Sequence, residues 1–326
     1  MKFPSLVRRS TVVAAIAALA LTAGCQQQQR GGGDYPSDSI TLLVPYAAGG
    51  TTDRMARVVA ENLQGKLGKP VVVTNKPGGG GAIAITELMK AKKDGHTIAI
   101  IATPTALIPP VLGQATYQPK DLAPIGLVAE QPIVVVTSAK SRFANAADFI
   151  AAAKAKPESV TIGTNGPTTS AGIEVKRFAD EYGVKLKQVP FQGEAELSSA
   201  LLGGNIDAMV TNASPATLSK IEGGQARPLA IFTPQRVPYL PEVPTFVELG
   251  FPKLTLATSR FGLVAGGGVP QEVLDKLAQT LRDALKDAKV IEGIGEQYVP
   301  KEFVDGTQWG KEMDEITKTY QEAVSG

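Results

Sequence analysis

The chain has 326 residues, of which 43% are hydrophobic and 20% are charged, and this composition provides enough apolar residues for two globular cores. Thirty-three basic against 31 acidic residues give a net charge of +2, which argues against the strong positive field of a nucleic-acid-binding protein. One cysteine excludes an internal disulfide and a multi-cysteine metal site, and one histidine argues against a His-based zinc site or a Ser-His-Asp triad.

Residues 1–24 have the pattern of a secretory signal. Basic residues precede an apolar run at 11–21, which is too short to span a bilayer, and small residues lead to Cys25. The segment Ala23-Gly24-Cys25 resembles the end of a bacterial lipoprotein signal, so we expect Cys25 to be lipidated and to anchor the exported protein to a membrane. An ordinary signal peptide that happens to contain a cysteine is the alternative.

Beyond residue 36, runs rich in β-branched residues alternate with helical patterns. The expected strands are Ile40–Val44, Val71–Thr74, Thr97–Ile101, Ile133–Thr137, Val160–Gly163, Leu186–Val189, Ala208–Val210, Leu229–Phe232 and Phe261–Val264. Two apolar stripes predict helices; they consist of Met55, Val58, Val59, Leu63 and Leu67, and of Leu274, Leu277, Leu281 and Leu285. Because strands and helices alternate, we predict parallel sheets covered by helices on both faces.

The length of the exported part suits two such sheets rather than one. Candidate crossings between domains lie at Gln131-Pro132 and at Thr258-Ser259. We therefore expect a signal peptide at 1–24, a flexible tether at 25–36, one domain formed by 37–131 plus 259–326, and a second domain at 132–258. A chain that leaves one domain, builds another and returns fits a hinged protein with a cleft between two lobes.

Two strand-to-helix loops, at 45–53 and 163–170, carry the residue types of an anion site. Each combines glycines, hydroxyl side chains and the start of a helix, whose free N–H groups and dipole favour a carboxylate or phosphate. Because ligands bind at the carboxyl ends of strands in open α/β sheets, the two loops would face each other across the cleft. The alternative is a tight turn in which Thr52 or Asp53 merely caps its helix.

Three further features are open to more than one interpretation. The glycine run Gly78–Gly81 fits only a loose dinucleotide pattern and indicates a tight strand-to-helix junction beside the cleft. His96 stands in a turn before a strand, where a structural role is the simpler interpretation. Arg260 has no acidic residue beside it in the sequence, so we expect its guanidinium to bind a second carboxylate of the ligand. The alternatives are a solvated arginine at the edge of a strand and an ion pair with a distant Asp or Glu.

Several segments in combination resemble the extracytoplasmic solute receptors of tripartite tricarboxylate transporters, the Bug or TctC family. They are ITLLVPYAAGGTTD, VVVTNKPGGGGAIA, KDGHTIAI, DLAPIGLVAEQPIVVV, GTNGPTTSAG, LLGGNIDAMV, RVPYLPEVPTFVELGF and FGLVAGGGVP. The resemblance runs from Ser39 to Ala323. It implies the type II periplasmic-binding-protein fold, in which two doubly wound α/β domains surround a hinged cleft.

The resemblance also implies which residues bind the ligand. One wall of the cleft would consist of Tyr46, Ala48, Gly49, Gly50, Thr51, Thr52 and Asp53, and the other of Gly163, Thr164, Asn165, Thr168, Thr169 and Ser170. Phe191, Gln192, Gly193 and Asn212 match segments that lie near the cleft in the family. Arg260 stands where members often carry an aromatic residue, and this departure puts the identity of the ligand in doubt.

We therefore expect a monomeric, non-enzymatic receptor at the periplasm or cell surface, without metal or cofactor. It would capture a small di- or tricarboxylate and deliver it to the permease subunits of a tripartite tricarboxylate transporter. One alternative is a secreted nucleotide-dependent oxidoreductase, which would need an acid-base pair that the sequence does not show. A second alternative is a domain that presents its ligand to a membrane sensor.

Overall fold

The structure, a computed structural model, describes residues 35–325. The chain divides into one unit at Met1–Ser37 and another at Asp38–Gly326, and the fold below is that of the second. The expected signal peptide, Cys25 and most of the expected tether lie outside the described residues. Within 35–325, no helix has both the length and the apolar character needed to cross a membrane.

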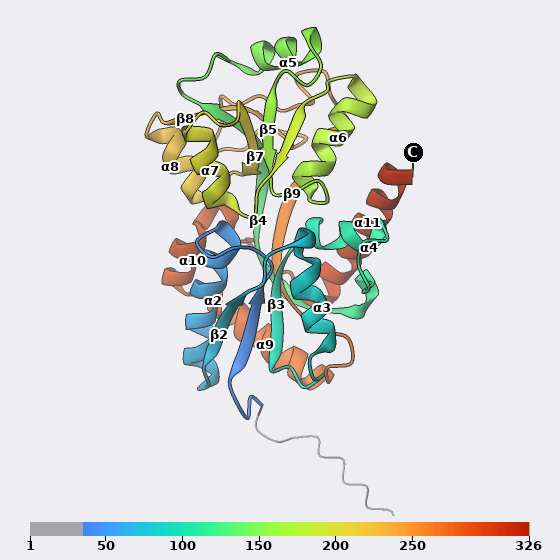
Figure 1. The fold of residues 1–326 in the computed structure, drawn as a ribbon. Coiled ribbons are helices and arrows are strands. Elements are labelled where there is room, and N and C mark those ends of the chain that lie inside the picture. The colour runs from blue at the N-terminus through green and yellow to red at the C-terminus, as the bar shows by residue number, and fades with distance from the viewer. Residues whose placement is uncertain (1–34, 326) are drawn as a thin grey trace, which may run out of the picture. The chain divides into compact units, whose positions relative to one another are not determined.

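Helices and strands alternate along the second unit (Figure 1). The strands are β1 (Ile40–Val44), β2 (Val71–Asn75), β3 (Thr97–Thr103), β4 (Leu122–Ser138), β5 (Thr161–Thr164), β6 (Lys187–Pro190), β7 (Ala208–Asn212), β8 (Ala226–Ile231) and β9 (Thr258–Gly266). The helices are α2 (Thr51–Leu67), α3 (Ala82–Lys90), α4 (Ile108–Val111), α5 (Ala146–Ala155), α6 (Ser170–Tyr182), α7 (Glu194–Leu202), α8 (Pro215–Glu222), α9 (Gln271–Ala284), α10 (Ala288–Ile294) and α11 (Gly306–Ser325).

The strands join in the order β2-β1-β3-β9-β4-β7-β5-β6, and β8 also pairs with β4. Pairing is parallel among β1, β2 and β3 and again among β5, β6 and β7. It is antiparallel in every pair that includes β4 or β9. The prediction of parallel sheets is therefore right for two groups of strands and wrong for β4 and β9, which join these groups.

The long strand β4 changes partners between Pro132 and Ile133. Up to Pro132 it pairs with β9, and from Ile133 onward it pairs with β7 and β8. The two candidate crossings face each other in this ladder, since Gln131 pairs with Ser259 and Pro132 with Thr258. Figure 1 shows β4 and β9 running between the two groups of strands. The division into 37–131 plus 259–326 and 132–258 stays a prediction, and its two candidate crossings are neighbours in this ladder.

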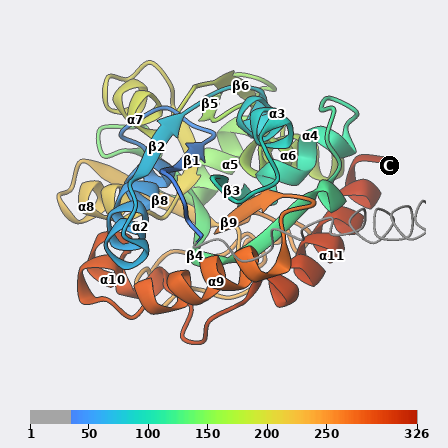
Figure 2. The ribbon, with the colours of Figure 1, turned by 90° about the horizontal axis from the view of Figure 1, so that it is seen from below.

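Helices cover both faces of the sheet, and each buries the apolar stripe that its sequence provides. In Figure 2, α9 and α11 lie on one side of β4 and β9, and α3 lies on the other. On α2, Met55, Val59 and Leu63 are buried, whereas Val58 and Leu67 are half-buried. The amphipathic face of each helix therefore fixes how it packs on the strands.

One contact in this core requires a glycine. Trp309 of α11 is fully buried, and its ring lies directly against the β9 backbone at Gly262. A Cβ on Gly262 would lie 2.4 Å from two ring atoms of Trp309 and 2.7 Å from the carbonyl oxygen of Gly126 in β4. The absence of a side chain at Gly262 is therefore what allows the indole to reach the strand pair.

Candidate functional site

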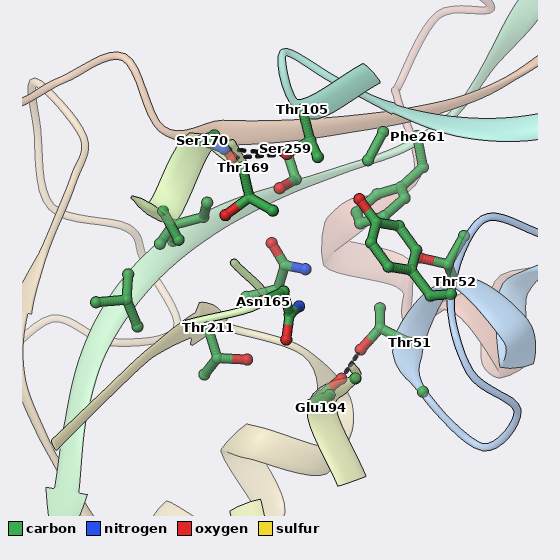
Figure 3. Close-up of a pocket in the computed structure, with 18 residues that line it drawn as sticks. Thr51, Thr52, Thr105, Asn165, Thr169, Ser170, Glu194, Thr211, Ser259 and Phe261 are labelled. Atoms are coloured by element: carbon green, nitrogen blue, oxygen red, sulfur yellow. Dashed lines mark hydrogen bonds between the residues drawn. The ribbon is translucent and has the colours of Figure 1, made fainter. Parts of the chain in front are cut away.

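A cavity of about 40 Å³ lies at the carboxyl ends of several strands, and Figure 3 shows the 18 described residues that line it. They are Tyr46, Gly50, Thr51, Thr52, Ala102, Thr105, Ile133, Asn165, Thr169, Ser170, Ala171, Gly193, Glu194, Val210, Thr211, Asn212, Ser259 and Phe261. Its position agrees with the rule that open α/β sheets bind ligands beyond the carboxyl ends of their strands.

The structure brings half of the expected site residues to this cavity. Those that line it are Tyr46, Gly50, Thr51, Thr52, Asn165, Thr169, Ser170, Gly193 and Asn212. Those that do not line it are Ala48, Gly49, Asp53, Gly163, Thr164, Thr168, Phe191, Gln192 and Arg260. Three members of the second group, Gly49, Asp53 and Thr164, hold the loops that place the first group.

Asp53 organises the first loop instead of facing the cavity. Its carboxylate accepts hydrogen bonds from the Gly49 N–H at 2.9 Å, from Arg57 at 2.9 and 3.0 Å, and from the Asn75 amide at 3.0 Å. Burial raises the pKa of Asp53, but the hydrogen bonds and the charge of Arg57 outweigh it, so the pKa of Asp53 lies below its ordinary value. Gly49, at φ 84°, makes the turn that lets α2 begin at Thr51 with its N-terminus toward the cavity.

Hydroxyl groups hold the second loop together. Thr169 caps α6, since its Oγ1 accepts from the Gly172 N–H at 3.1 Å and donates to the Gly166 carbonyl at 2.8 Å. Thr164 accepts from the Gly166 N–H at 3.2 Å and from the Gln188 amide at 2.7 Å, so its hydroxyl is used within the loop. This loop keeps Ser170 at the start of α6, on the cavity wall.

The glycine run forms the tight junction that the sequence indicates. Gly78–Gly81 all have positive φ angles and lead through a short 3₁₀ turn into α3. A Cβ on Gly80 would lie 2.8 Å from Thr168 Oγ1 and 3.2 Å from the Thr168 carbonyl oxygen. The run therefore lets the chain pass close to the loop at 163–170. This close approach accounts for the glycines, so a nucleotide-binding role is not needed to explain them.

Several lining residues were not predicted, and Thr105, Glu194, Thr211 and Ser259 are the polar ones. Thr105 follows the end of β3 and hydrogen-bonds Ser170, with 3.1 Å between the two hydroxyls and 3.2 Å from the Ser170 N–H to Thr105 Oγ1. Glu194 accepts a hydrogen bond from the hydroxyl of Thr51. Two features of the sequence could have indicated these residues. Thr105 follows the end of a predicted strand, and Glu194 directly follows the predicted site residue Gly193.

The cavity has little charge of its own. Glu194 is the only charged side chain among its described lining residues. Burial raises the pKa of Tyr46 to about 12, partly offset by a hydrogen bond with Thr105, so its phenol stays neutral and can donate a hydrogen bond. Within residues 35–325, no group of His, Cys, Asp and Glu is arranged to hold a metal ion.

Arg260 does not line the cavity, contrary to the expectation from the sequence. Its guanidinium forms ion pairs with Glu130 of β4 at 2.5 Å and with Glu312 of α11 at 3.1 Å. Both partners are distant in sequence, and Glu130 faces Arg260 in the β4–β9 ladder. Arg260 therefore pairs with two carboxylates of the protein itself, whereas the sequence led us to expect a ligand carboxylate.

We expect Arg260→Ala to lower the free energy of unfolding by about 1–2 kcal/mol, because two partly buried carboxylates lose their cation. It should leave the ranking of carboxylate ligands unchanged. Urea unfolding and calorimetry measure the two effects, and Lys176→Ala, which removes an exposed ion pair with Asp180, is the control. A loss of dicarboxylate affinity without a loss of stability would contradict this structural role and show that Arg260 contacts the ligand.

Comparison with known proteins identifies the chain. The family model described as "Tripartite tricarboxylate transporter family receptor" matches residues 55–317. Protein BugT of Bordetella pertussis is 34% identical over 266 residues, which cover 81% of each chain. A solved structure described as a periplasmic transporter has 32% identity and a TM-score of 0.82, covering 89% of this chain and 97% of that one.

A further solved structure, R. palustris Rpa4515 with adipate, has 26% identity and a TM-score of 0.79 over 89% of this chain and 97% of its own. These likenesses confirm the predicted α/β fold of periplasmic binding proteins. They also confirm the resemblance that the sequence motifs carry. The chain belongs to the tripartite tricarboxylate transporter receptor family, of the Bug or TctC type.

Proposed function

We propose that the protein is a non-enzymatic receptor that binds a small organic carboxylate in this cavity and delivers it to a tripartite tricarboxylate transporter permease. The observation that carries the proposal is the pair of helix N-termini, α2 at Thr51 and α6 at Ser170, that open onto one cavity from two loops. Membership of the family and the adipate in a relative of this fold support the class of ligand.

The two walls have the chemistry to hold one carboxylate. Thr51, Thr52 and Ser170 stand at the first or second positions of α2 and α6, at the positive end of each helix dipole. The Thr51 hydroxyl already donates to Glu194, and Ser170 already bonds Thr105. Thr52 and the N–H groups of the first turn of α2 are therefore the donors proposed for the ligand. Tyr46 adds a neutral phenol. Hydrogen bonds from such donors to an ionised acceptor are shorter and stronger than those between neutral groups, so a carboxylate needs no lysine or arginine here.

The residues around the cavity give the oxidoreductase alternative no support. Its described lining residues include no histidine and only one carboxylate, Glu194, so no acid-base pair is present among them. The glycine run, on which that alternative depended, is explained by its close approach to Thr168.

Contacts between the two expected domains suggest how binding is signalled. The Thr105–Ser170 and Thr51–Glu194 hydrogen bonds each join a residue of 37–131 to a residue of 132–258. We infer that the domains close around the ligand and that only the closed form places both helix N-termini on it. A permease could then recognise the closed form.

A thermal-shift screen tests the proposal directly. A ligand that binds only the folded state stabilises it by about 2.7 kcal/mol at a concentration of 100 Kd. We expect at least one acid to raise the Tm in a screen of mono-, di- and tricarboxylates, aromatic acids and amino acids. If no acid raises the Tm, the proposed function is wrong, and a nucleotide that does so would favour the oxidoreductase alternative.

We expect Thr52→Val to weaken carboxylate binding about tenfold, because it removes a hydroxyl from the cavity wall while keeping the shape of the side chain. The Tm of the free protein should change little. Thr280→Val is the matched control, because Thr280 is also buried in a helix but its hydroxyl donates to the Lys276 carbonyl of α9. Calorimetry that finds equal affinities for Thr52→Val and the control would remove Thr52 from the site.

We also propose that the protein is exported and held at a membrane by a lipid on Cys25, which lies outside the described residues. Cys25→Ser should then either release the protein from the membrane fraction or leave the signal uncleaved. Fractionation with immunoblotting and the mass of the mature N-terminus measure this. Identical fractionation of both forms as free protein would contradict the anchor.

A further inference from the structure

We propose that Glu194 makes the receptor selective for carboxylates that also carry a protonated amine. The proposal rests on the proposed function and adds the chemistry of the second ligand group. Glu194 is the first residue of α7, and only 7% of it is exposed. Figure 3 shows its carboxylate beside Thr51, on the side of the cavity where Asn165 and Thr211 also lie.

The contacts of Glu194 hold its carboxylate at the cavity wall. Oε1 accepts hydrogen bonds from Ser214 at 2.6 Å and Thr217 at 3.1 Å, and Oε2 accepts one from Thr51. Each carboxylate oxygen can accept two hydrogen bonds, so Oε1 is saturated and Oε2 has room for one more. The nearest cation, Arg54, lies 3.7 Å from Oε2, but its side chain is 42% exposed, and solvent screens its charge.

Two amide oxygens add to the acceptors of the cavity. Oδ1 of Asn165 and Oδ1 of Asn212 are buried, and neither accepts a hydrogen bond within residues 35–325. Both residues line the cavity with Glu194. A buried acceptor without a donor is costly, so these oxygens favour a ligand that brings N–H groups. An ammonium group offers three such donors and a positive charge opposite Glu194.

The same carboxylate disfavours a ligand with two negative charges. No lysine or arginine is among the described residues that line the cavity. A second ligand carboxylate would therefore face Glu194 in a poorly solvated space with no lining cation, and like charges repel strongly there. Amino acids and related zwitterions match both the helix N-termini and Glu194, whereas a simple dicarboxylate matches only the former.

Calorimetry with four short acids tests the proposal. Butyrate, succinate, 2-aminobutyrate and 4-aminobutyrate share a four-carbon skeleton and differ in whether a second charged group is present, in its sign and in its position. We expect wild type to bind one of the amino acids at least about tenfold more tightly than butyrate or succinate, as a charge-assisted hydrogen bond provides. Glu194→Gln should lose about tenfold to a hundredfold of that affinity, keep butyrate affinity and gain affinity for succinate.

Glu196→Gln is the control, because Glu196 lies on the same helix, is exposed and does not line the cavity. It should bind all four acids as wild type does. Equal losses for all four acids in Glu194→Gln would show a purely structural role, and succinate as the tightest wild-type ligand would overturn the proposal even if Glu194→Gln does not fold. Binding without any charge preference refutes this inference alone, whereas failure of every acid in the wider screen refutes the proposed function as well.

Discussion

Gly172→Ala is expected to cost roughly 3 kcal/mol or more of folding stability and to abolish measurable carboxylate binding. A Cβ at this position of α6 would lie 2.3 Å from the Gly166 carbonyl oxygen and 2.7 Å from Pro167 Cα and from the Pro167 carbonyl oxygen. All three atoms belong to the backbone, so no side chain can rotate away. The loop that would have to move is the one that places Asn165 and Thr169 at the cavity.

Gly65→Ala is the matched control. Gly65 also lies in a helix, α2, but a Cβ there meets nothing within 4 Å. Alanine in the helix interior should therefore stabilise the protein by roughly 0.5–1 kcal/mol. Urea unfolding and calorimetry would compare the two variants with wild type. A Gly172→Ala protein as stable as wild type would show that the loop tolerates displacement.

Glu174→Gln is expected to stabilise the protein at pH 8 by roughly 2–3 kcal/mol and to have little effect at pH 4. Glu174 of α6 is fully buried, and burial raises its pKa from 4.5 to about 7 despite the opposing charge of Arg177. Its Oε1 accepts from Arg177 and from the Leu256 N–H, each at 3.1 Å, but its buried Oε2 has no partner within residues 35–325.

The direction of the pH dependence follows from proton binding. Between pH 4.5 and about 7 the folded protein holds the proton of Glu174 more tightly than the unfolded chain does. The contribution of Glu174 to stability is therefore complete below pH 4.5 and is lost as the pH rises through about 7. A glutamine stays neutral throughout and should remove this loss.

Unfolding free energies at pH 4, 6 and 8 would measure the effect. Glu61→Gln, on the exposed face of α2, is the control for removing a carboxylate from a helix and should leave the free energy of unfolding nearly unchanged, as surface substitutions usually do. Glu174→Gln and wild type differ at one side chain, so the difference between their curves reports on Glu174 and the groups that it contacts. Parallel curves for those two would show that the Glu174 carboxylate is ionised in the fold at no cost.

Local sequence patterns predicted most of the secondary structure. All nine expected strands correspond to strands of the structure, and β1 has the predicted bounds of Ile40–Val44. The length of β4 was not predicted, because Pro124 and Gly126 interrupt the β pattern of its first half. The structure accommodates them at an irregularity in the β4–β9 register, where the missing N–H of proline is tolerated.

Local sequence patterns also predicted some residues of the site and missed others. Thr51, Thr52, Thr169 and Ser170 could be predicted because strand, glycine loop and helix follow one another directly in the chain. The partners of Arg260 could not, because Glu130 and Glu312 reach it only through a strand ladder and a packed helix. Chain order shows which loops follow strands, but pairs between distant segments depend on tertiary packing.

Trp309 is an intrinsic fluorophore beside β4 and β9, the two strands that join the two groups of the sheet. It is the only tryptophan in the chain, and its indole rests against Gly262 of β9, close to the Gly126 carbonyl of β4. Tryptophan emission from the native protein therefore comes from one place, next to the strands that join the two groups of the sheet. Any ligand that bends this strand pair should shift the emission, so binding rates become accessible by stopped-flow fluorescence without an added dye.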